Sequence, residues 1–365
     1  MTSLVLAVLL TDLAIAAAPP VQVPTAPVEP SGSEHLAGES LVGEAPEGQA
    51  TDAGSTESAS PSPLRLEDVW AGQGVDTVLE EAVGRRSVGD FQGADDRLAW
   101  LLRIAPGPEP TYHAAVSAEL QERYDDALQG YETVLSNWPG DPRSVDAGFR
   151  RALVLEDLGR HKDAIRQVRV LQRSGDWSEQ DEQSLALARG VNELGQGRVR
   201  RGLRRLDRAL ESAEGADGLA WMRAKARAAL ARHLLRSAQG IPMVHGRRAS
   251  RNLEARAAAI SGAERQVIAI ANLGEAEYAL AGLELLGDAY LALHDDIVAL
   301  PPPGGLTAAQ ATLYREGIAE KSAVLRRKAW RYYDEGVKLA TRTEWQGAIA
   351  DRLRVRRDGL EDAAP

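Results

Sequence analysis

One spacing of residues occurs four times in the first two thirds of the chain, and it limits the fold more than any other feature. Its clearest copy consists of Tyr124, Ala127, Tyr131 and Val134, which follow one another at intervals of three, four and three residues. These intervals place all four side chains on one face of an α-helix. The same intervals recur in residues 91–101, 161–171 and 199–209. The sequence therefore predicts four helices of one kind, each with an inward face.

Two other positions recur at fixed distances before the central small residue of each copy, which is Ala94, Ala127, Ala164 or Gly202. Another small residue stands twelve positions earlier, namely Ala82, Ala115, Ala152 or Gly190. A turn position stands five residues earlier, namely Gly89, Glu122, Gly159 or Gly197. Antiparallel helices approach closely where both carry small side chains, so we expect Ala115 to face Ala127. The pattern thus predicts four helix–turn–helix pairs.

This pattern resembles the tetratricopeptide repeat (TPR) family, most clearly in the segments GDFQGADDRLAWLLRIAP and ERYDDALQGYETVLSNWP. The copies lie 33, 37 and 38 residues apart, against a family period of about 34 residues. We expect the extra residues in turns or lengthened helices. The resemblance implies an all-α solenoid of antiparallel helix pairs. The alternative is an unrelated helical bundle in which alanines recur by chance.

Composition supports an all-α fold and removes several kinds of chemistry. Aromatic residues make up only 5% of the chain, and no alternating strand pattern stands out. The chain has no cysteine, which excludes disulfides, cysteine-ligated metals, a thiol nucleophile and a lipid-modified N-terminal cysteine.

The first 64 residues differ from the rest of the chain. Residues 1–18 have an apolar run followed by small-x-small patterns, which indicates a signal peptide and a protein exported to the periplasm or cell envelope. The alternative is a cytoplasmic protein with an apolar, alanine-rich start. Residues 19–64 are rich in Pro, Gly, Ser, Ala and Glu, which predicts a disordered acidic linker.

The formal net charge of −10 comes mostly from this first part. Residues 1–64 hold eight acidic residues and no Lys or Arg, whereas the remainder holds 45 acidic and 43 basic residues. The folded part is therefore nearly neutral, and we expect no nucleic-acid partner.

We predict four repeats in residues 65–214 and a C-terminal helical extension in residues 215–365. The extension is expected to contain longer helices near 217–239, 253–273, 276–297 and 307–340, with Thr307 and Gln310 forming a capping box. Residues 275–350 resemble the end of exported bacterial TPR proteins, some of which belong to cell-envelope or gliding-motility machinery. That resemblance brings no catalytic residues with it.

The motifs of catalysis are missing from the sequence. It contains no phosphate-binding Gly-x4-Gly-Lys loop, no His-Glu-x-x-His zinc motif and no Gly-x-Ser-x-Gly elbow. His294, Asp295 and Asp296 are consecutive, so on a helix their side chains diverge, and a solvated helix end is the favoured interpretation. We therefore predict no catalytic residue, metal or cofactor and no enzymatic activity. An enzyme with an unrecognised site is the alternative.

Residues 198–208 contain six arginines, at positions 198, 200, 201, 204, 205 and 208. Val199, Leu203, Leu206 and Leu210 form the opposite stripe, so we expect the arginines to form a solvated face. The alternative function that follows is a cytoplasmic TPR adaptor or regulator, in which this helix contacts an anionic partner.

The TPR resemblance also implies a binding groove lined by the first helix of each pair. The corresponding positions are all apolar: Leu79, Val83, Tyr112, Val116, Phe149, Leu153, Leu187 and Val191. Acidic residues border them, among them Glu109 and Asp146, so the hypothesis is a groove for a peptide that carries basic residues. The alternative is that the protein's own C-terminal helices cover this stripe.

Taken together, these features predict a non-enzymatic scaffold of the bacterial cell envelope that binds a protein or peptide. We expect no integral membrane span in the mature chain, and an envelope complex is the expected setting.

Overall fold

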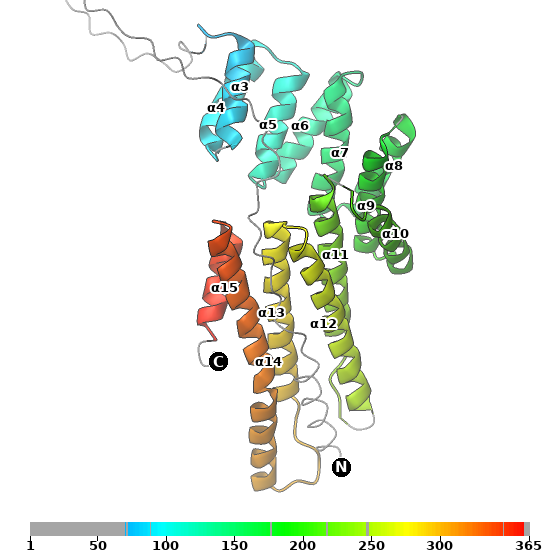
Figure 1. Ribbon diagram of the computed structural model, residues 1–365, viewed down its shortest axis with the longest axis vertical. Coiled ribbons are helices and arrows are strands. Elements are labelled where there is room, and N and C mark those ends of the chain that lie inside the picture. Colours follow the sequence, from blue (N-terminus) through cyan, green and yellow to red (C-terminus); the bar gives the residue numbers. More distant parts are fainter. Residues whose placement is uncertain are drawn as a thin grey trace, which may run out of the picture. The chain divides into compact units, whose positions relative to one another are not determined.

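The protein was analysed as a computed structural model. The structure describes residues 70–360, apart from residues 71, 88, 176, 217, 246–247 and 346. The described residues are helical without any strand, which confirms the predicted all-α class (Figure 1). The predicted signal peptide and acidic linker lie outside the described residues.

The helices follow one another in antiparallel order. In the part of the sequence with the four repeats they are α3 (Val75–Ser87), α4 (Phe91–Ile104), α5 (Pro108–Leu120), α6 (Tyr124–Asn137), α7 (Pro142–Asp157), α8 (His161–Ser174), α9 (Glu179–Gly195) and α10 (Val199–Ser212). After them come α11 (Ala220–Gln239), α12 (Ala249–Ala271), α13 (Ala276–Val298), α14 (Ala308–Arg342) and α15 (Ala348–Asp358). The longer helices predicted for the C-terminal extension are confirmed, since α11–α14 have 20 to 35 residues each.

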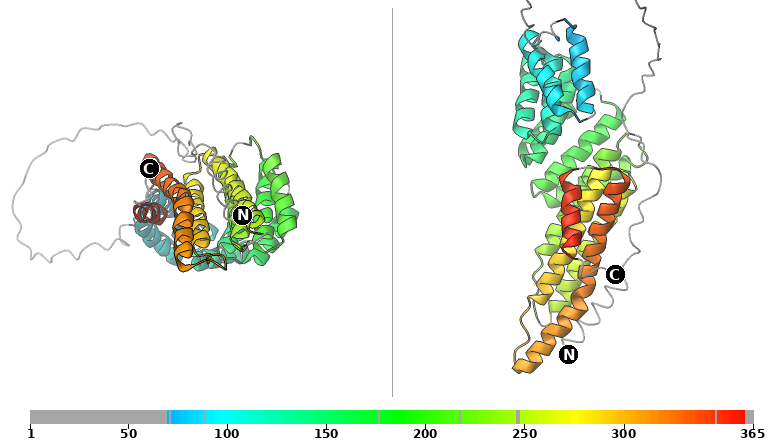
Figure 2. Two further views of the ribbon diagram at one scale, coloured as in Figure 1. Left: turned by 90° about the horizontal axis from the view of Figure 1, so that it is seen from below. Right: turned by 90° about the vertical axis from the view of Figure 1, so that its left-hand side faces the viewer.

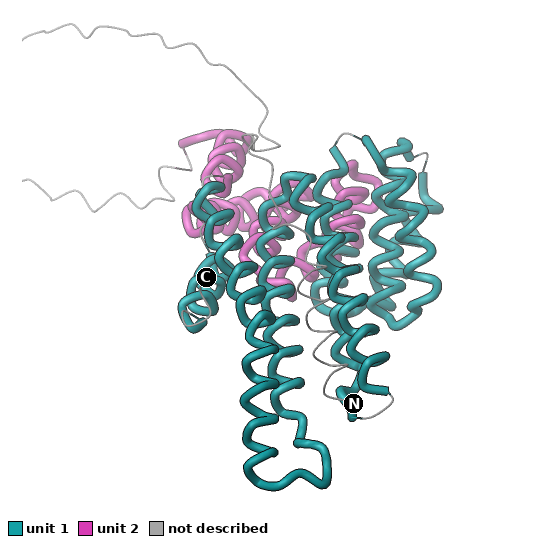
Figure 3. Tube along the Cα trace, turned by 60° about the horizontal axis from the view of Figure 1, so that its bottom comes forward, with its two compact units in different colours: residues 1–26, 151–365 teal, residues 27–150 magenta. Residues whose placement is uncertain are grey.

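The chain forms two compact units, which divide inside α7 between residues 150 and 151 (Figure 3). Unit 2 contains described residues 70–150 and unit 1 contains described residues 151–360. This division does not test the predicted end of the repeats at residue 214, which stays a prediction.

The four predicted turn positions share one backbone conformation. Their φ angles are +83° at Gly89, +58° at Glu122, +70° at Gly159 and +82° at Gly197. In each copy the next residue donates its N–H to a carbonyl five residues back, as from Arg198 to Glu193 at 3.0 Å. This is the hydrogen bond that ends a helix in the Schellman motif. The turn pattern read from the sequence is therefore confirmed.

Small residues bring paired helices close together. A Cβ atom added to Gly130 of α6 would lie 2.7 Å from the Cβ of Ala115 in α5. Ala115 therefore lies close to Gly130, a contact that the sequence did not predict. Ala115 and Ala127 are both buried, and their predicted contact stays a prediction. In the fourth pair, a Cβ atom on Gly202 would lie 2.6 Å from the backbone nitrogen of Leu194.

In unit 1 the helices form two layers. The pairs α9/α10, α11/α12 and α13/α14 pack as hairpins, and α9, α11 and α13 pack against one another in sequence. We call these three first helices the inner layer. Figures 1 and 2 show α13 and α14 side by side, with the start of α14 projecting beyond the end of α13. The predicted capping box at Thr307 and Gln310 opens α14.

Each unit has its own apolar core. In unit 2, Trp70 meets Trp100 edge-on at a centroid distance of 6.0 Å, over Val78 and Leu101. In unit 1, the core runs through α11–α15 and includes the fully buried Tyr333. Tyr333 lies against Gly287 and donates its hydroxyl to Asp288 at 2.7 Å.

Candidate partner-binding site

The eight apolar residues predicted to line a groove are mostly buried. Five of them are at most 6% exposed: Tyr112, Val116, Leu153, Leu187 and Val191. The other three, Leu79, Val83 and Phe149, are half-buried. Side chains buried this deeply offer little area to a partner and pack within the protein itself. Their role in partner binding stays a prediction.

The acidic residues predicted at the groove edge are already bonded within unit 2. Glu109 accepts a bond from Arg143, and Asp146 accepts one from the hydroxyl of Tyr112. Arg150 lies 3.3 Å from Glu119 and 3.7 Å from Asp146. A basic peptide bound along this edge would have to compete with these arginines for the carboxylates.

His113 in α5 lies in the same polar region. Arg86 of α3 donates to the carbonyl of His113 at 3.1 Å. Burial, together with the positive charges of Arg86 and Arg143, lowers the pKa of His113 to about 4. The imidazole is therefore neutral at physiological pH, and in this form it does not add to the local positive charge.

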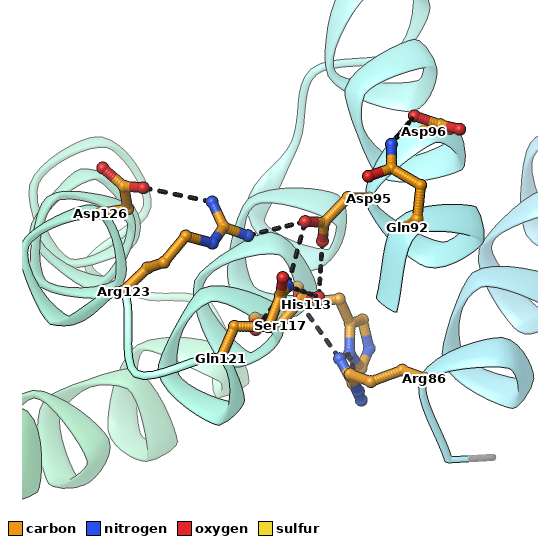
Figure 4. Close-up of polar contacts among 9 residues, drawn as sticks. All are labelled: Arg86, Gln92, Asp95, Asp96, His113, Ser117, Gln121, Arg123 and Asp126. Atoms are coloured by element: carbon orange, nitrogen blue, oxygen red, sulfur yellow. Dashed lines mark hydrogen bonds and ion pairs between the residues drawn. The ribbon is translucent and has the colours of Figure 1, made fainter. Parts of the chain in front are cut away.

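Figure 4 shows a second polar hub in unit 2, which sequence reasoning missed. Asp95 of α4 accepts bonds from Ser117 at 2.6 Å, from Gln121 at 3.0 Å and from Arg123 at 2.7 Å. These donors come from the end of α5 and the turn that follows it. The hub therefore holds α4 against the hairpin α5/α6 and has the geometry of a structural contact.

A hollow that combines apolar and charged residues lies on the inner layer of unit 1. We call it the inner pocket; its volume is about 470 Å³. Its apolar lining comes from Val191 and Leu194 of α9, Ala229 and Leu235 of α11, and Leu285 of α13. Its charged lining comes from Glu156, Asp157, His161, Arg232, Arg236 and Asp288. Val191 is a predicted groove residue, so the pocket adjoins the predicted stripe.

A buried polar network borders the inner pocket and connects four helices. Asn192 of α9 donates to Glu156 of α7 at 2.9 Å, and its side-chain oxygen lies 3.0 Å from Nδ1 of His161 in α8. Lys225 of α11 lies 3.5 Å from Glu156 and 3.3 Å from Asp157. His161 also packs against Gly195.

Lys225 is the charged centre of this network and is only 7% exposed. Burial disfavours its ammonium form, but Glu156 and Asp157 outweigh that effect and raise the pKa of Lys225 above its ordinary value. The lysine is therefore a permanent positive charge beneath the pocket at physiological pH. Its ion pairs hold the carboxylates of Glu156 and Asp157 in place at the pocket edge.

The arginines of α10 are exposed, except for the half-buried Arg205, as the sequence predicted. The opposite stripe is buried at Leu206 and Leu210, but Val199 at the start of the helix is 36% exposed. The buried side of the first turn of α10 is instead formed by Gly202, which lies against Leu194 of α9.

The described residues contain no group of three or more His, Asp or Glu side chains placed to hold a metal ion. His294 faces the carbonyl of Ser322 at 3.2 Å, while Asp296 pairs with Arg256 at 2.6 Å. These two side chains thus bond to different partners, as expected from their divergent directions on a helix. Within the described part of the chain, no helix has both the length and the apolar character needed to cross a membrane.

Comparison with known proteins gives only distant likenesses. No family model matches the chain, and no curated protein matches it. A tetratricopeptide repeat protein from Parabacteroides merdae has 15% identity and a TM-score of 0.39, covering 78% of this chain and 98% of its own. Yeast Tom70 has 11% identity and a TM-score of 0.29, covering 80% of this chain and 81% of its own. Neither likeness is close enough to support an inference about function.

Proposed function

We propose that this protein is a non-enzymatic scaffold that binds a segment of a partner protein in the inner pocket of unit 1. The observation that carries the proposal is the position of that pocket. It lies where the three helices of the inner layer pack side by side, which is where a stack of helix pairs offers a continuous concave surface.

The lining of the pocket favours a peptide over a small metabolite. Its apolar floor has room for a few side chains, and its edge carries the exposed Arg232 and Arg236. The carboxylates of Asp157 and Asp288 at the same edge already pair with Lys225 and Arg356. A helix or extended segment with apolar anchors and acidic residues fits such a surface. This peptide differs from the basic peptide that the acidic residues beside the predicted groove of unit 2 suggested.

Site-specific photo-crosslinking tests the proposal. A photoreactive amino acid at Arg232, which is exposed at the pocket, should crosslink a protein partner in the native cell. The matched control is Ala258, which is exposed on α12 in the other layer. Mass spectrometry should find one dominant partner at position 232 and no such partner at position 258. Equal crosslinking at both positions would contradict the proposal.

A second variant separates loss of binding from loss of folding. Leu285→Arg places a charge on the apolar floor, where Leu285 is half-buried, and should abolish the crosslink at position 232. Ala258→Arg should leave it unchanged. Far-UV circular dichroism should show the same helicity for both variants. A folded Leu285→Arg variant that still crosslinks the partner would place the binding surface elsewhere.

We further propose that the scaffold acts after export, in the periplasm or cell envelope. The support is the pattern of residues 1–18, which resembles a signal peptide. We expect the native protein to begin between residues 16 and 19 and to fractionate with the envelope. A native protein that starts at Met1 in the cytosolic fraction would overturn this proposal and favour the cytoplasmic adaptor.

A further inference from the structure

The guanidinium group of Arg256 in α12 is buried without enough hydrogen-bond partners. Arg256 is only 2% exposed, and its Nη1 atom donates to Asp296 of α13 at 2.6 Å. Its Nε atom is also buried and has no hydrogen-bond partner among the described residues. A guanidinium group has five N–H donors, so the bond to Asp296 leaves most of them unused. Burial of unused donors is costly, which makes Arg256 a candidate for binding a further acceptor.

Arg256 lines a pocket that lies beside the ends of α11 and α13. We call it the end pocket; its volume is about 270 Å³. Pockets for drug-sized ligands have roughly 300–1,000 Å³, so a ligand of the end pocket should be small. Its walls are mostly apolar and come from the loop after α11 and from the residues after α13. The lining residues are Gln239, Ile241, Pro242, Met243, Arg256, Asp296, Ala299 and Leu300.

The end pocket carries charges of both signs that balance one another. Among its lining residues, Arg256 is the only basic one and Asp296 the only acidic one. The side chain of Arg256 is 3% exposed and that of Asp296 is 52% exposed, so the positive group lies deep and the negative group faces solvent. The C-terminal end of α13 adds partial negative charge beside Asp296. A fitting ligand therefore has a negative group for the interior and a positive group for the exposed side.

We propose that the end pocket binds a free α-amino acid with an aliphatic side chain. Its carboxylate accepts hydrogen bonds from Arg256, because guanidinium and carboxylate groups form planar, charge-assisted pairs. Its ammonium group pairs with Asp296. Its side chain contacts the apolar walls at Ile241, Met243 and Leu300, which removes apolar surface from water. The zwitterion has no net charge, as the balanced charges of the pocket require.

The inference does not depend on the proposed scaffold function. Gln239 at the end of α11 lines both the end pocket and the inner pocket, and the two share no other lining residue. Binding of a free amino acid is measured without the partner protein. Its failure would therefore leave the crosslinking test of the inner pocket unaffected.

Isothermal titration of the full-length protein with L-leucine tests the inference. Leucine should bind saturably at one site per chain, with a dissociation constant below about 1 mM. Leucinamide lacks the carboxylate and 4-methylpentanoate lacks the ammonium group, so each should bind at least about ten-fold more weakly. Glutamate would place a charge against the apolar walls and should show no saturable binding.

The substitution Asp296→Asn tests the role of the two charges. It removes the partner of the ligand's ammonium group and leaves Arg256 as an unbalanced positive charge. Leucine should then bind at least about ten-fold more weakly, whereas 4-methylpentanoate should bind more tightly than it does to the wild-type chain. A purely structural role of Asp296 would not reverse this preference. The matched control is Asp295→Asn, an exposed neighbour that does not line the pocket, which should leave both affinities unchanged.

A second pair of variants blocks the pocket without changing its charges. Ala299→Trp places a large side chain at an exposed position of the pocket wall and should abolish leucine binding. Val298→Trp changes the preceding residue, which is 40% exposed and does not line the pocket, and should leave binding unchanged. Far-UV circular dichroism and melting curves should show that all four variants remain folded.

Three results would overturn the inference. The absence of saturable leucine binding to the wild-type chain would show that the end pocket takes up only water. Equal affinities for leucine, leucinamide and 4-methylpentanoate would show that Arg256 and Asp296 do not recognise the two charged groups. Equal losses of affinity with Asp296→Asn and Asp295→Asn, or with the two tryptophan variants, would place leucine at another site.

Discussion

The change Glu122→Gly should stabilise unit 2, which few single substitutions do. Glu122 is the turn residue between α5 and α6 and has a φ of +58°. The other three copies of this turn have glycine at the same position. The exposed side chain of Glu122 forms no hydrogen bond or ion pair with a described residue, so its removal costs no contact.

Two opposing terms set the size of the effect. A residue with a side chain in the left-handed conformation costs roughly 1–2 kcal/mol, and glycine removes that cost. Glycine also adds conformational freedom to the unfolded chain, which costs about 0.5–1 kcal/mol. The expected gain in the free energy of unfolding is therefore about 0.5–1 kcal/mol. The Schellman bond from Arg123 to Ala118, at 2.9 Å, should be unchanged.

Hydrogen exchange of the α5 and α6 amides measures this gain, together with the urea midpoint of the full chain. Glu122→Ala is the control, because alanine removes the same side chain but keeps the strained conformation. It should leave stability unchanged, whereas Gly197→Ala in the fourth copy should lower it by about 1 kcal/mol. If Glu122→Gly and Glu122→Ala had the same effect, the backbone argument would be refuted.

Further outcomes follow from the burial of single residues. The pKa of His113 is lowered to about 4, so the unfolded chain binds more protons between about pH 6.5 and pH 4, and stability should fall as pH falls through that window. His113→Gln should flatten this part of a melting-temperature profile. Ala127→Trp should unfold the repeat region, because Ala127 is fully buried, whereas Gln129→Trp on the exposed side should not; equal melting shifts would mean that the register is wrong. Gly202→Ala should cost about 1–3 kcal/mol in urea unfolding, because its Cβ would press on the backbone of Leu194, while Gly84→Ala, with open space around it, should be neutral or stabilising.

The parts of the fold that were predictable depend on local spacing. The four turns and the inward faces of the repeat helices follow from residues within about twelve positions of one another, so one copy of the pattern suffices to predict each pair. The contact of Ala115 with Gly130 did not follow, because it depends on how far the two helices slide along each other. That offset is set by packing across the interface, which no single helix encodes.

The candidate site was less predictable for a related reason. Lys225 and Glu156 are 69 positions apart, and neither belongs to a recognisable motif, so only the stacking of α11 on α9 and α7 brings them together. The apolar stripe was identified as a periodic pattern, but periodicity cannot tell a groove floor from a packed core. Burial at Tyr112 and Leu187 shows how much of that stripe packs inside the protein.

The network beneath the inner pocket also links binding to the cooperativity of unfolding. Glu156 and His161 both line the pocket and join the bonds that connect α7, α8, α9 and α11. Separating any one of these helices would leave Lys225 or Asn192 without its partner in a dry interior, which is costly. The four helices should therefore unfold together around this network. A partner bound in the pocket should slow hydrogen exchange in all four, including α8, which contributes only its first residue to the pocket.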